Sequence, residues 1–313
     1  MNGMITLIIS LITKALLFLF FAWLFIPLYL PSHIDKLTKH LFLPKQQVVV
    51  LMYHHISNHP VGKIIITPEL FGQHLNILQK EGYHVISLEQ YARFLEGKSV
   101  IPDKSAVITF DDGYESFYTY AYPQLVKKHM PATDFVVVGL VGNCNRQKSL
   151  LKLTWSQMKE MQSHNMSFYP HSFSGHYLAY TYPYGREKPC LTGRIWLTPQ
   201  KRWETKLEYV NRTTNDFKKA KEIMEQNLGK PMLHYSWPYG KDSPLALKIA
   251  RSVGFKYFYY VDNKSLHVYP QFFCAPRFNA GDIQNTKQTF DKNMHHYILK
   301  QNLYYLKSRL LNI

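Results

Sequence analysis

Short apolar runs and longer segments of helical periodicity alternate along residues 46–261 of the 313-residue chain. The short runs are rich in β-branched and aromatic residues, as in 48–51, and are typical of buried strands. The longer segments repeat apolar positions three or four residues apart, as in Leu70, Phe71, Leu75 and Leu78. About seven such alternations predict a parallel sheet covered by helices. We therefore expect an α/β fold, a distorted (β/α)7-type barrel in which distant strand ends meet around one mouth.

Local signals place most element boundaries. Thr67 followed by Pro68 predicts a helix start, because Thr is a favoured N-cap and Pro fits the first helical position. Residues 177–201, rich in aromatic residues and Pro, are interpreted as a loop. The predicted strands are 46–52, 85–86, 107–110, 135–138, 168–169, 233–237 and 256–261. The predicted helices are 67–82, 88–95, 114–128, 155–164, 203–228, 244–253 and a C-terminal helix at 291–313.

The N-terminal region contains a nearly continuous apolar run at residues 15–31, preceded by Lys14. A bilayer is spanned by about 20 apolar residues, or somewhat fewer when the flanking residues reach the interface. A secretory signal peptide is the alternative, but it needs a small-x-small cleavage site after the apolar run, and none is present. We expect residues 1–31 to be a retained N-terminal transmembrane helix (or an uncleaved signal) and residues 32–45 a juxtamembrane linker.

Composition and charge exclude several classes of protein. The hydrophobic content of 46% and aromatic content of 15% argue against disorder. The formal net charge is +16, but the Lys and Arg residues are scattered, so nucleic acid is not an expected partner. Attraction to anionic membrane lipid or wall polymers fits such a charge. The cysteines at 144, 190 and 274 have no Cys-x-x-Cys spacing, so neither a cysteine zinc site nor a disulfide framework is predicted.

Two neighbouring carboxylates, Asp111 and Asp112, follow the apolar run at 106–108 within Thr109-Phe110-Asp111-Asp112-Gly113. Catalytic groups in α/β proteins project from such strand ends. Because strand side chains alternate, the two carboxylates cannot point the same way. One can bind a metal while the other faces a substrate. Asp-Asp-Gly alone is also a common turn sequence, so the pair needs further support.

That support comes from two later motifs. His171 and His176 lie about sixty residues further on, close enough to share one metal ion. One Asp with two His forms a ligand set for a divalent cation that leaves positions open for water and substrate. The sequence Trp237-Pro238-Tyr239-Gly240 follows another apolar run. The chain has fifteen His, so the combination of motifs, rather than the His pair alone, indicates a site.

These motifs and Tyr53-His54-His55-Ile56 occur in the order seen in polysaccharide deacetylases with the NodB-homology domain. The spacing in His171-Ser172-Phe173-Ser174-Gly175-His176 is one residue wider than in most branches. It resembles the intercellular adhesin deacetylases, which act on poly-β-1,6-N-acetyl-D-glucosamine. The resemblance covers residues 46–290, which we take as a polysaccharide deacetylase domain.

The resemblance implies a hydrolase that removes acetyl groups from an exported N-acetylglucosamine polymer and so supports polymer retention and biofilm formation. Its cofactor would be a divalent metal, with Zn expected and Ni, Co or Fe as alternatives. Partners would include the polymer, membrane lipid and the machinery that makes and exports the polymer. The catalytic domain would lie outside the cytoplasm on a single-pass anchor, or be secreted and bound to the cell surface if the N-terminus is cleaved.

The same resemblance assigns roles to residues. Asp112, His171 and His176 would hold the metal, and Asp111 would act as general base. The backbone N–H of Tyr239 would be an oxyanion donor, Trp237 and Tyr239 would wall the sugar site, and Pro238 would stiffen this loop. The predicted substrate-binding residues are thus Trp237, Pro238 and Tyr239.

Departures from the family pattern leave two roles open. Many members carry an Arg before Pro-Tyr that orients the base, whereas Ser236 and Trp237 stand there in this chain. Arg277 is our candidate for that role. A late Leu-x-His, which elsewhere supplies the general acid, is not present, so His55 is the candidate acid or substrate contact.

Three functions remain open at this stage. The first is metal-dependent de-N-acetylation of the β-1,6-linked polymer. The second is the same chemistry on peptidoglycan or chitin-type oligomers, because loops rather than motifs set the shape of a groove. The third is a metal-free carbohydrate-binding protein on the same scaffold, against which the intact acid pair and both His argue.

Overall fold

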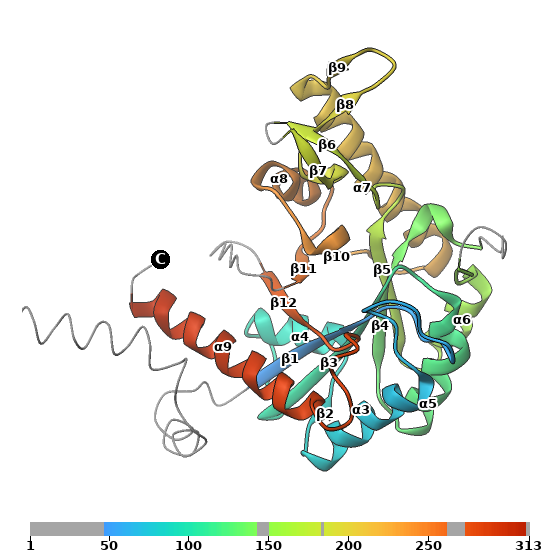
Figure 1. The fold of residues 1–313 in the computed structure, drawn as a ribbon, viewed down its shortest axis with the longest axis vertical. Helices are drawn as coiled ribbons and strands as arrows, with labels where there is room; N and C mark the ends of the chain where they lie inside the picture. The colour runs from blue at the N-terminus through green and yellow to red at the C-terminus, as the bar shows by residue number, and fades with distance from the viewer. Residues whose placement is uncertain (1–46, 143–149, 183–184, 262–272, 311–313) are drawn as a thin grey trace, which may run out of the picture. The chain divides into compact units, whose positions relative to one another are not determined.

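Eight strands form one parallel sheet in the computed structural model, which describes residues 47–142, 150–182, 185–261 and 273–310 (Figure 1). Seven follow in the order β10-β11-β12-β1-β3-β4-β5, and β2 pairs with the start of β3. Their bounds are β1 (Gln47–Tyr53), β2 (His84–Val85), β3 (Lys104–Asp111), β4 (Ala132–Val137), β5 (Met166–Ser172), β10 (His234–Ser236), β11 (Tyr257–Val261) and β12 (Phe273–Asn279). Because all pairs are parallel, the carboxyl ends of these strands share one rim.

Helices follow most of these strands and cover the outer face of the sheet (Figure 1). Thr67 caps α3 as predicted, with its side chain accepting from the N–H of Leu70 and Pro68 opening the helix. The predicted helix at 114–128 is instead a π-helical turn, Phe117–Ala121, followed by α5. The helices are α3 (Pro68–Lys80), α4 (Leu88–Leu95), α5 (Tyr122–Lys127), α6 (Trp155–Gln162), α7 (Lys206–Leu228), α8 (Pro244–Ser252) and α9 (Phe290–Leu310).

The two edge strands of the sheet, β5 and β10, close the barrel without a hydrogen-bonded ladder between them in the part of the chain that the structure describes. Side chains bridge this seam instead. The ring of His171 bonds to the backbone oxygen of Ser236 at 2.9 Å, and the rings of Tyr169 and His234 lie 4.4 Å apart. The prediction of a nearly closed parallel α/β barrel is confirmed.

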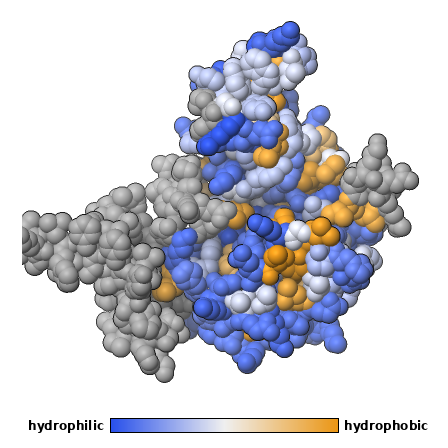
Figure 2. Space-filling view, viewed as in Figure 1, coloured by the Kyte–Doolittle hydropathy of each residue, from blue (hydrophilic) through white to orange (hydrophobic). Residues whose placement is uncertain are grey.

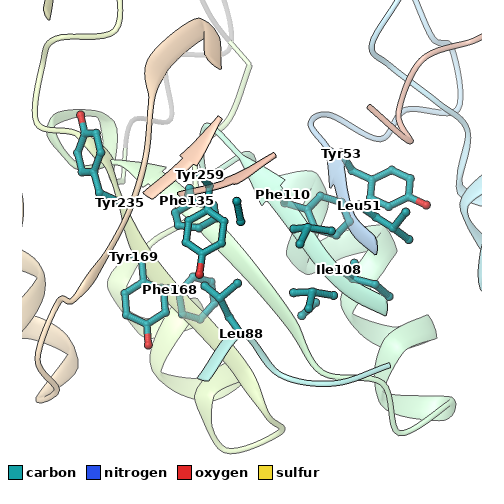
Figure 3. Packing of buried hydrophobic residues seen from close by; sticks show 14 of the residues in the cluster. Leu51, Tyr53, Leu88, Ile108, Phe110, Phe135, Phe168, Tyr169, Tyr235 and Tyr259 are labelled. Atoms are coloured by element: carbon teal, nitrogen blue, oxygen red, sulfur yellow. The ribbon is translucent and has the colours of Figure 1, made fainter. Parts of the chain in front are cut away.

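Alternation along the strands separates a polar-aromatic interior from an apolar exterior. On β3, Phe110 points outward and stacks with Tyr53 (Figure 3). Because strand side chains alternate, Asp111 points inward, where Arg277 binds it. The rings of Phe135 and Tyr259 meet inside the barrel, 5.2 Å apart (Figure 3). The interior thus has an aromatic layer beneath the charged groups of the rim.

Residues 177–201 do not form the predicted loop. Strands β6 (Leu178–Tyr182), β7 (Arg186–Pro189), β8 (Arg194–Leu197) and β9 (Arg202–Trp203) form an antiparallel sheet in the order β7-β6-β8-β9, which we call the small sheet. Its strands have two to five residues and expose aromatic side chains, so the expected alternation of apolar and polar residues is hidden. The long helix begins at Lys206 rather than 203, because Thr205 caps it and Trp203 belongs to β9.

Two further expectations concern the ends of the chain. The C-terminal helix is present as α9, and Phe290 at its start stacks on His74 with ring centroids 3.9 Å apart. Within the described residues, no helix combines the length and apolar composition needed to cross a bilayer. The predicted anchor at 1–31 and linker at 32–45 lie outside the described residues.

Candidate active site

A buried ion pair between Asp111 and Arg277 lies at the rim of the barrel. The guanidinium donates two hydrogen bonds to the carboxylate, from Nη1 to Oδ1 at 2.7 Å and from Nη2 to Oδ2 at 2.6 Å. Arg277 Nη2 also donates to the hydroxyl of Ser236 at 2.8 Å. Burial alone would raise the pKa of Asp111, but the charge of Arg277 lowers it below its usual value. Asp111 is therefore an oriented, ionised carboxylate.

Arg277 reaches Asp111 from β12, a strand that the sequence analysis did not predict. Pro276 explains the omission, because proline in a central strand argues against such an assignment. The contact that our hypothesis for Arg277 requires is present. Ser236, one of the two residues that precede Pro238-Tyr239, accepts a hydrogen bond from Arg277.

Asp112 leaves the strand in a left-handed conformation, with φ of 77°, which non-glycine residues rarely adopt. Its N–H still donates to the backbone oxygen of Phe135. Gly113 follows with φ of 65°, and a Cβ there would lie 2.9 Å from a methyl group of Val136. This turn sends the Asp112 carboxylate away from Asp111 and toward the two histidines. Strain of this kind is concentrated at functional sites.

His171 is the extra residue of a β-bulge, because Val136 pairs with Pro170 while Val137 pairs with Ser172. Bulges re-aim side chains beside active sites. Its Nδ1–H donates to the Ser236 carbonyl, which leaves the lone pair on Nε2. Burial lowers the pKa of His171 to about 4, so the ring is neutral near pH 7, as a metal ligand must be.

The segment between the two histidines is held by a carboxylate from α7. Asp216 accepts from the backbone N–H of Phe173 at 3.0 Å and of Ser174 at 2.8 Å. Gly175 permits a close approach to Leu191, whose side chain would lie 2.8 Å from an added Cβ. No local sequence signal indicated Asp216, because it lies more than forty residues after Phe173, on a helix whose charged residues are typical of a solvent-exposed face.

Asp112, His171 and His176 offer one ligand atom each, and these atoms all lie within 4.8 Å of one another. Asp112 Oδ1 lies 3.1 Å from His176 Nε2 and 3.7 Å from His171 Nε2. This buried oxygen accepts no well-formed hydrogen bond among the described residues. Burial disfavours charge on His176, but the Asp112 carboxylate raises the pKa of His176 above its usual value. An unsatisfied oxygen facing two imidazole nitrogens fits a divalent cation.

The two histidines after β1 occupy different environments. His55 Nδ1 is hydrogen-bonded to Ser116 at 2.9 Å, and its ring packs 5.1 Å from that of Tyr114. His54 Nδ1 is buried and has no partner among the described residues. His54 is also near enough to lower the pKa of both Asp111 and Asp112. His55 is the residue predicted from the sequence, and the environment of His54 makes it a candidate for the same role.

The three residues of Trp237-Pro238-Tyr239 do not share one environment, because two are buried and one lies at the site. Trp237 is 1% exposed and packs against Phe217 and Phe258, so it does not wall the sugar site. The reason is strand alternation: Ser236 points inward, so Trp237 points outward beneath α7. Pro238 is buried as well. Tyr239 is 43% exposed, has φ of 57°, and lies 4.6 Å from the His176 ring.

An open pocket of about 380 Å³ lies beside this cluster and could hold a sugar ring. Lys152 reaches it, with Nζ donating to the Asp112 backbone oxygen at 2.9 Å and lying 3.5 Å from the centre of the Tyr114 ring. No motif pointed to Lys152, which follows the predicted strand of Asp111 by about forty residues. The pocket is lined by Asp112, Tyr114, Lys152, Ser174, His176 and Tyr177, among others.

Comparisons with a family model and with curated proteins both match the chain to deacetylases. The family described as Polysaccharide deacetylase matches residues 98–258, just over half of the chain. Poly-beta-1,6-N-acetyl-D-glucosamine N-deacetylase of Escherichia coli (strain K12) is 24% identical over 233 residues, which cover 70% of this chain and 34% of that protein. The chain thus spans about a third of that relative's length. The protein of the same name from Staphylococcus aureus (strain MRSA252) is 23% identical, with 74% and 73% covered.

Solved structures share the fold. A de-N-acetylase from Aggregatibacter actinomycetemcomitans superposes with a TM-score of 0.65 at 26% identity, covering 74% of this chain and 94% of that one. IcaB from Ammonifex degensii superposes with a TM-score of 0.59 at 24% identity, covering 76% and 93%. From the match over half of its length, the chain belongs to the polysaccharide deacetylase family, whose members are hydrolases acting on N-acetyl amide bonds.

Proposed function

We propose that this protein removes acetyl groups from poly-β-1,6-N-acetyl-D-glucosamine in a metal-dependent hydrolysis. The observation that carries the proposal is the Asp112, His171 and His176 cluster beside an Asp111 carboxylate fixed by Arg277. Two relatives bear the name of a deacetylase for this polymer, which supports the substrate. The wider spacing between His171 and His176 supports the same branch of the family.

Asp112, His171 and His176 would hold the cation. When bound there, a divalent cation supplies Lewis acidity to the acetamide carbonyl and makes water a stronger nucleophile near neutral pH. Zn suits the imidazole and carboxylate ligands, and Ni, Co or Fe accept them too.

The residues of the chain would supply the remaining steps. Asp111 takes the proton of the attacking water, and Arg277 keeps that carboxylate ionised and aimed into the site. The Tyr239 backbone N–H, in its left-handed turn beside His176, stabilises the oxyanion. His55 or His54 gives the proton that the leaving amine requires. The products are acetate and a glucosamine unit of the polymer.

The setting of the reaction is also part of the proposal. We place the catalytic domain outside the cytoplasm, tethered by residues 1–31 next to the emerging polymer and its synthesis and export machinery. Each deacetylation exposes an amine, which is cationic near neutral pH because its pKa is roughly 7 to 8. A cationic polymer adheres to anionic cell surfaces and so supports biofilm formation.

The test uses the full chain, purified in detergent, with β-1,6- and β-1,4-linked N-acetylglucosamine oligomers. We expect acetate release from the β-1,6 series and one divalent metal per chain. Asp112→Ala and His176→Ala should lose both the metal and the activity, since two remaining ligands hold a labile ion poorly. Equal metal content in both variants would refute the ligand assignment. Faster acetate release from β-1,4 oligomers or peptidoglycan would show that these, and not the β-1,6 polymer, are the substrate. Sugar binding without acetate release would show that the protein is a carbohydrate-binding protein and not an enzyme.

A further inference from the structure

The small sheet exposes a continuous aromatic face next to the site. Three aromatic side chains on it are exposed among the described residues: Tyr180 at 55%, Tyr182 at 46% and Trp196 at 39%. Their rings carry polar edges, so this face is not a purely aliphatic patch. From the side drawn in Figure 2, the lobe that contains β6 to β9 is mostly pale and blue, with few strongly hydrophobic atoms.

The strand register places these side chains on one face. Thr181 pairs with Ile195 and Tyr182 with Arg194, so Tyr180 stands opposite Trp196. Trp196 pairs in turn with Trp203, and their rings lie 5.3 Å apart. The Arg194 guanidinium lies 4.0 Å from the centre of the Tyr182 ring. The rings therefore support one another in a row across β6, β8 and β9.

The opposite face of the small sheet is the one that packs on the protein. Thr181 is fully buried, and Ile195 packs against the hydrophobic core. Glu204, just after β9, accepts from the N–H of Ile195 and from Arg212 of α7. Antiparallel sheets usually cover one face and present polar side chains on the other. Here the outward face presents Tyr and Trp instead, which indicates a binding surface.

This face is continuous with the candidate active site. Strand β6 begins at Leu178, two residues after His176, and the intervening Tyr177 lines the pocket beside Asp112. Leu178, Tyr180 and Tyr182 then follow on the same face, about 6.8 Å apart along the strand. A polymer chain whose reacting unit lies at His176 can thus continue along β6.

We propose that the aromatic face of the small sheet is a docking surface for the acetylated part of the N-acetylglucosamine polymer outside the reacting unit. The inference rests on the proposed function. Tyr and Trp rings offer flat apolar surfaces to the C–H faces of sugar rings, and their O–H and N–H groups suit hydroxyls and acetamides. A lipid surface is disfavoured because Leu178 is the one exposed aliphatic side chain among the described residues of this face, and a single such side chain gives little apolar area to enter acyl chains.

The charges around this face favour the acetylated polymer over the product. Residues 177–203 carry one acid, Glu187, and five cationic residues, Arg186, Lys188, Arg194, Lys201 and Arg202. Glu187 pairs with Tyr180 and so stands on the aromatic face, and Arg202 is ion-paired with Glu208, but the balance of charge remains positive. Arg194 lies within the aromatic row itself. An N-acetylated unit is neutral, whereas a deacetylated unit carries an ammonium group that these residues repel. The net positive charge of this region therefore favours polymer that has not yet reacted.

The first measurement is direct binding, which needs no catalysis. The full chain is run in native gels that contain acetylated or fully deacetylated polymer, alongside the variant Tyr180→Ala/Trp196→Ala. We expect acetylated polymer to retard the wild-type protein, with an apparent dissociation constant about tenfold higher in the double variant, since each aromatic contact contributes modestly. Leu207→Ala, an exposed position on α7 outside this face, is the matched control and should bind as the wild type does.

The second measurement separates this inference from the proposed function. The ratio of kcat/KM for long polymer to kcat/KM for a disaccharide should fall about tenfold in the double variant through KM and stay unchanged in Leu207→Ala. Equal gel retardation and an equal ratio in wild type and double variant would overturn the docking surface while acetate release continues. Lack of acetate release from any substrate would refute the proposed function and leave the retardation result to decide the docking surface. Tighter binding to deacetylated than to acetylated polymer would also overturn the inference.

Discussion

Two arginines make the same bidentate ion pair in two regions of the molecule. At the barrel rim, Arg277 donates to both oxygens of Asp111, and the two side chains are 0% and 3% exposed. At the small sheet, Arg202 donates to both oxygens of Glu208 at 2.7 Å, and the two are 45% and 41% exposed. The geometry is the same, and only the surrounding medium differs.

The difference separates the tasks of the two regions. At the buried rim, water cannot replace Arg277 as the hydrogen-bond donor to Asp111. Arg277 therefore fixes the direction of the Asp111 carboxylate and keeps it charged. On the small sheet, water solvates either partner, and the side chains are free to adapt to a ligand. The proposed chemistry thus uses the buried, rigid rim, and the proposed docking of a long polymer uses the solvent-exposed aromatic face.

The largest expected effect comes from removing charge at the rim. Asp111→Asn keeps the shape of the side chain but cannot accept a proton, so we expect kcat to fall by roughly two to four orders of magnitude. The metal should stay, because Asp112, His171 and His176 are unchanged. Acetate release and metal analysis on the same sample provide the check. Near-normal turnover would remove Asp111 from the mechanism.

Arg277→Met breaks the buried pair and leaves Asp111 uncompensated in the interior. We expect a loss of about 3–5 kcal/mol in the free energy of unfolding. Arg202→Met is the matched control on the small sheet and should change that free energy little. Urea denaturation of both variants gives the comparison. Equal destabilisation by the two substitutions would show that burial does not distinguish the pairs.

Two tryptophans extend the comparison to packing. Trp237, at 1% exposure, lies beneath α7, whereas Trp196, at 39% exposure, lies on the small sheet. We expect Trp237→Ala to lower the free energy of unfolding by about 3–5 kcal/mol, as buried aromatic truncations do. Trp196→Ala should cost no more than about 1.5 kcal/mol, because it loses only an edge-to-face contact with Trp203. A larger loss for Trp196→Ala would give that residue a structural role in place of the docking role.

The smallest effect per residue concerns pH. Burial lowers the pKa of His234 to about 3 and that of His74 to about 4, while an unfolded histidine titrates near 6.5. Below about pH 6.5 these histidines therefore bind protons in the unfolded chain but not in the folded barrel. The free energy of unfolding thus decreases as the pH decreases. At pH 5 each histidine should cost about 2 kcal/mol. Urea denaturation at pH 7 and pH 5 measures this, and His234→Gln should reduce the difference.

The sequence predicted the parallel barrel because strand and helix periods are local properties of the chain. Thr67 and Pro68 marked a helix start for the same reason. Strand β12 escaped prediction because Pro276 interrupts its pattern, although its neighbours supply the pairing on both sides. The small sheet escaped because its exposed face is aromatic, so the period of two was not visible as apolar against polar.

At the site, the residues that lie within motifs could be predicted from the sequence. The residues that hold them in place could not. Asp111, Asp112, His171 and His176 were nominated from spacing and resemblance. Asp216 and Lys152 act across folded contacts that no local signal encodes. Trp237 was misassigned because the motif does not tell which way a strand residue faces. Inward Ser236 settles that question once the barrel is known.

The seam between β5 and β10 gives His171 a structural role besides its proposed role as a metal ligand. Its Nδ1–H joins two sheet edges that no ladder joins in the described part of the chain, and its Nε2 faces Asp112. A ligand bound to Nε2 of His171 therefore also strengthens the connection between the two sheet edges. Occupancy of the site would resist separation of the edges, so loading would raise the resistance of the whole barrel to unfolding by mass action.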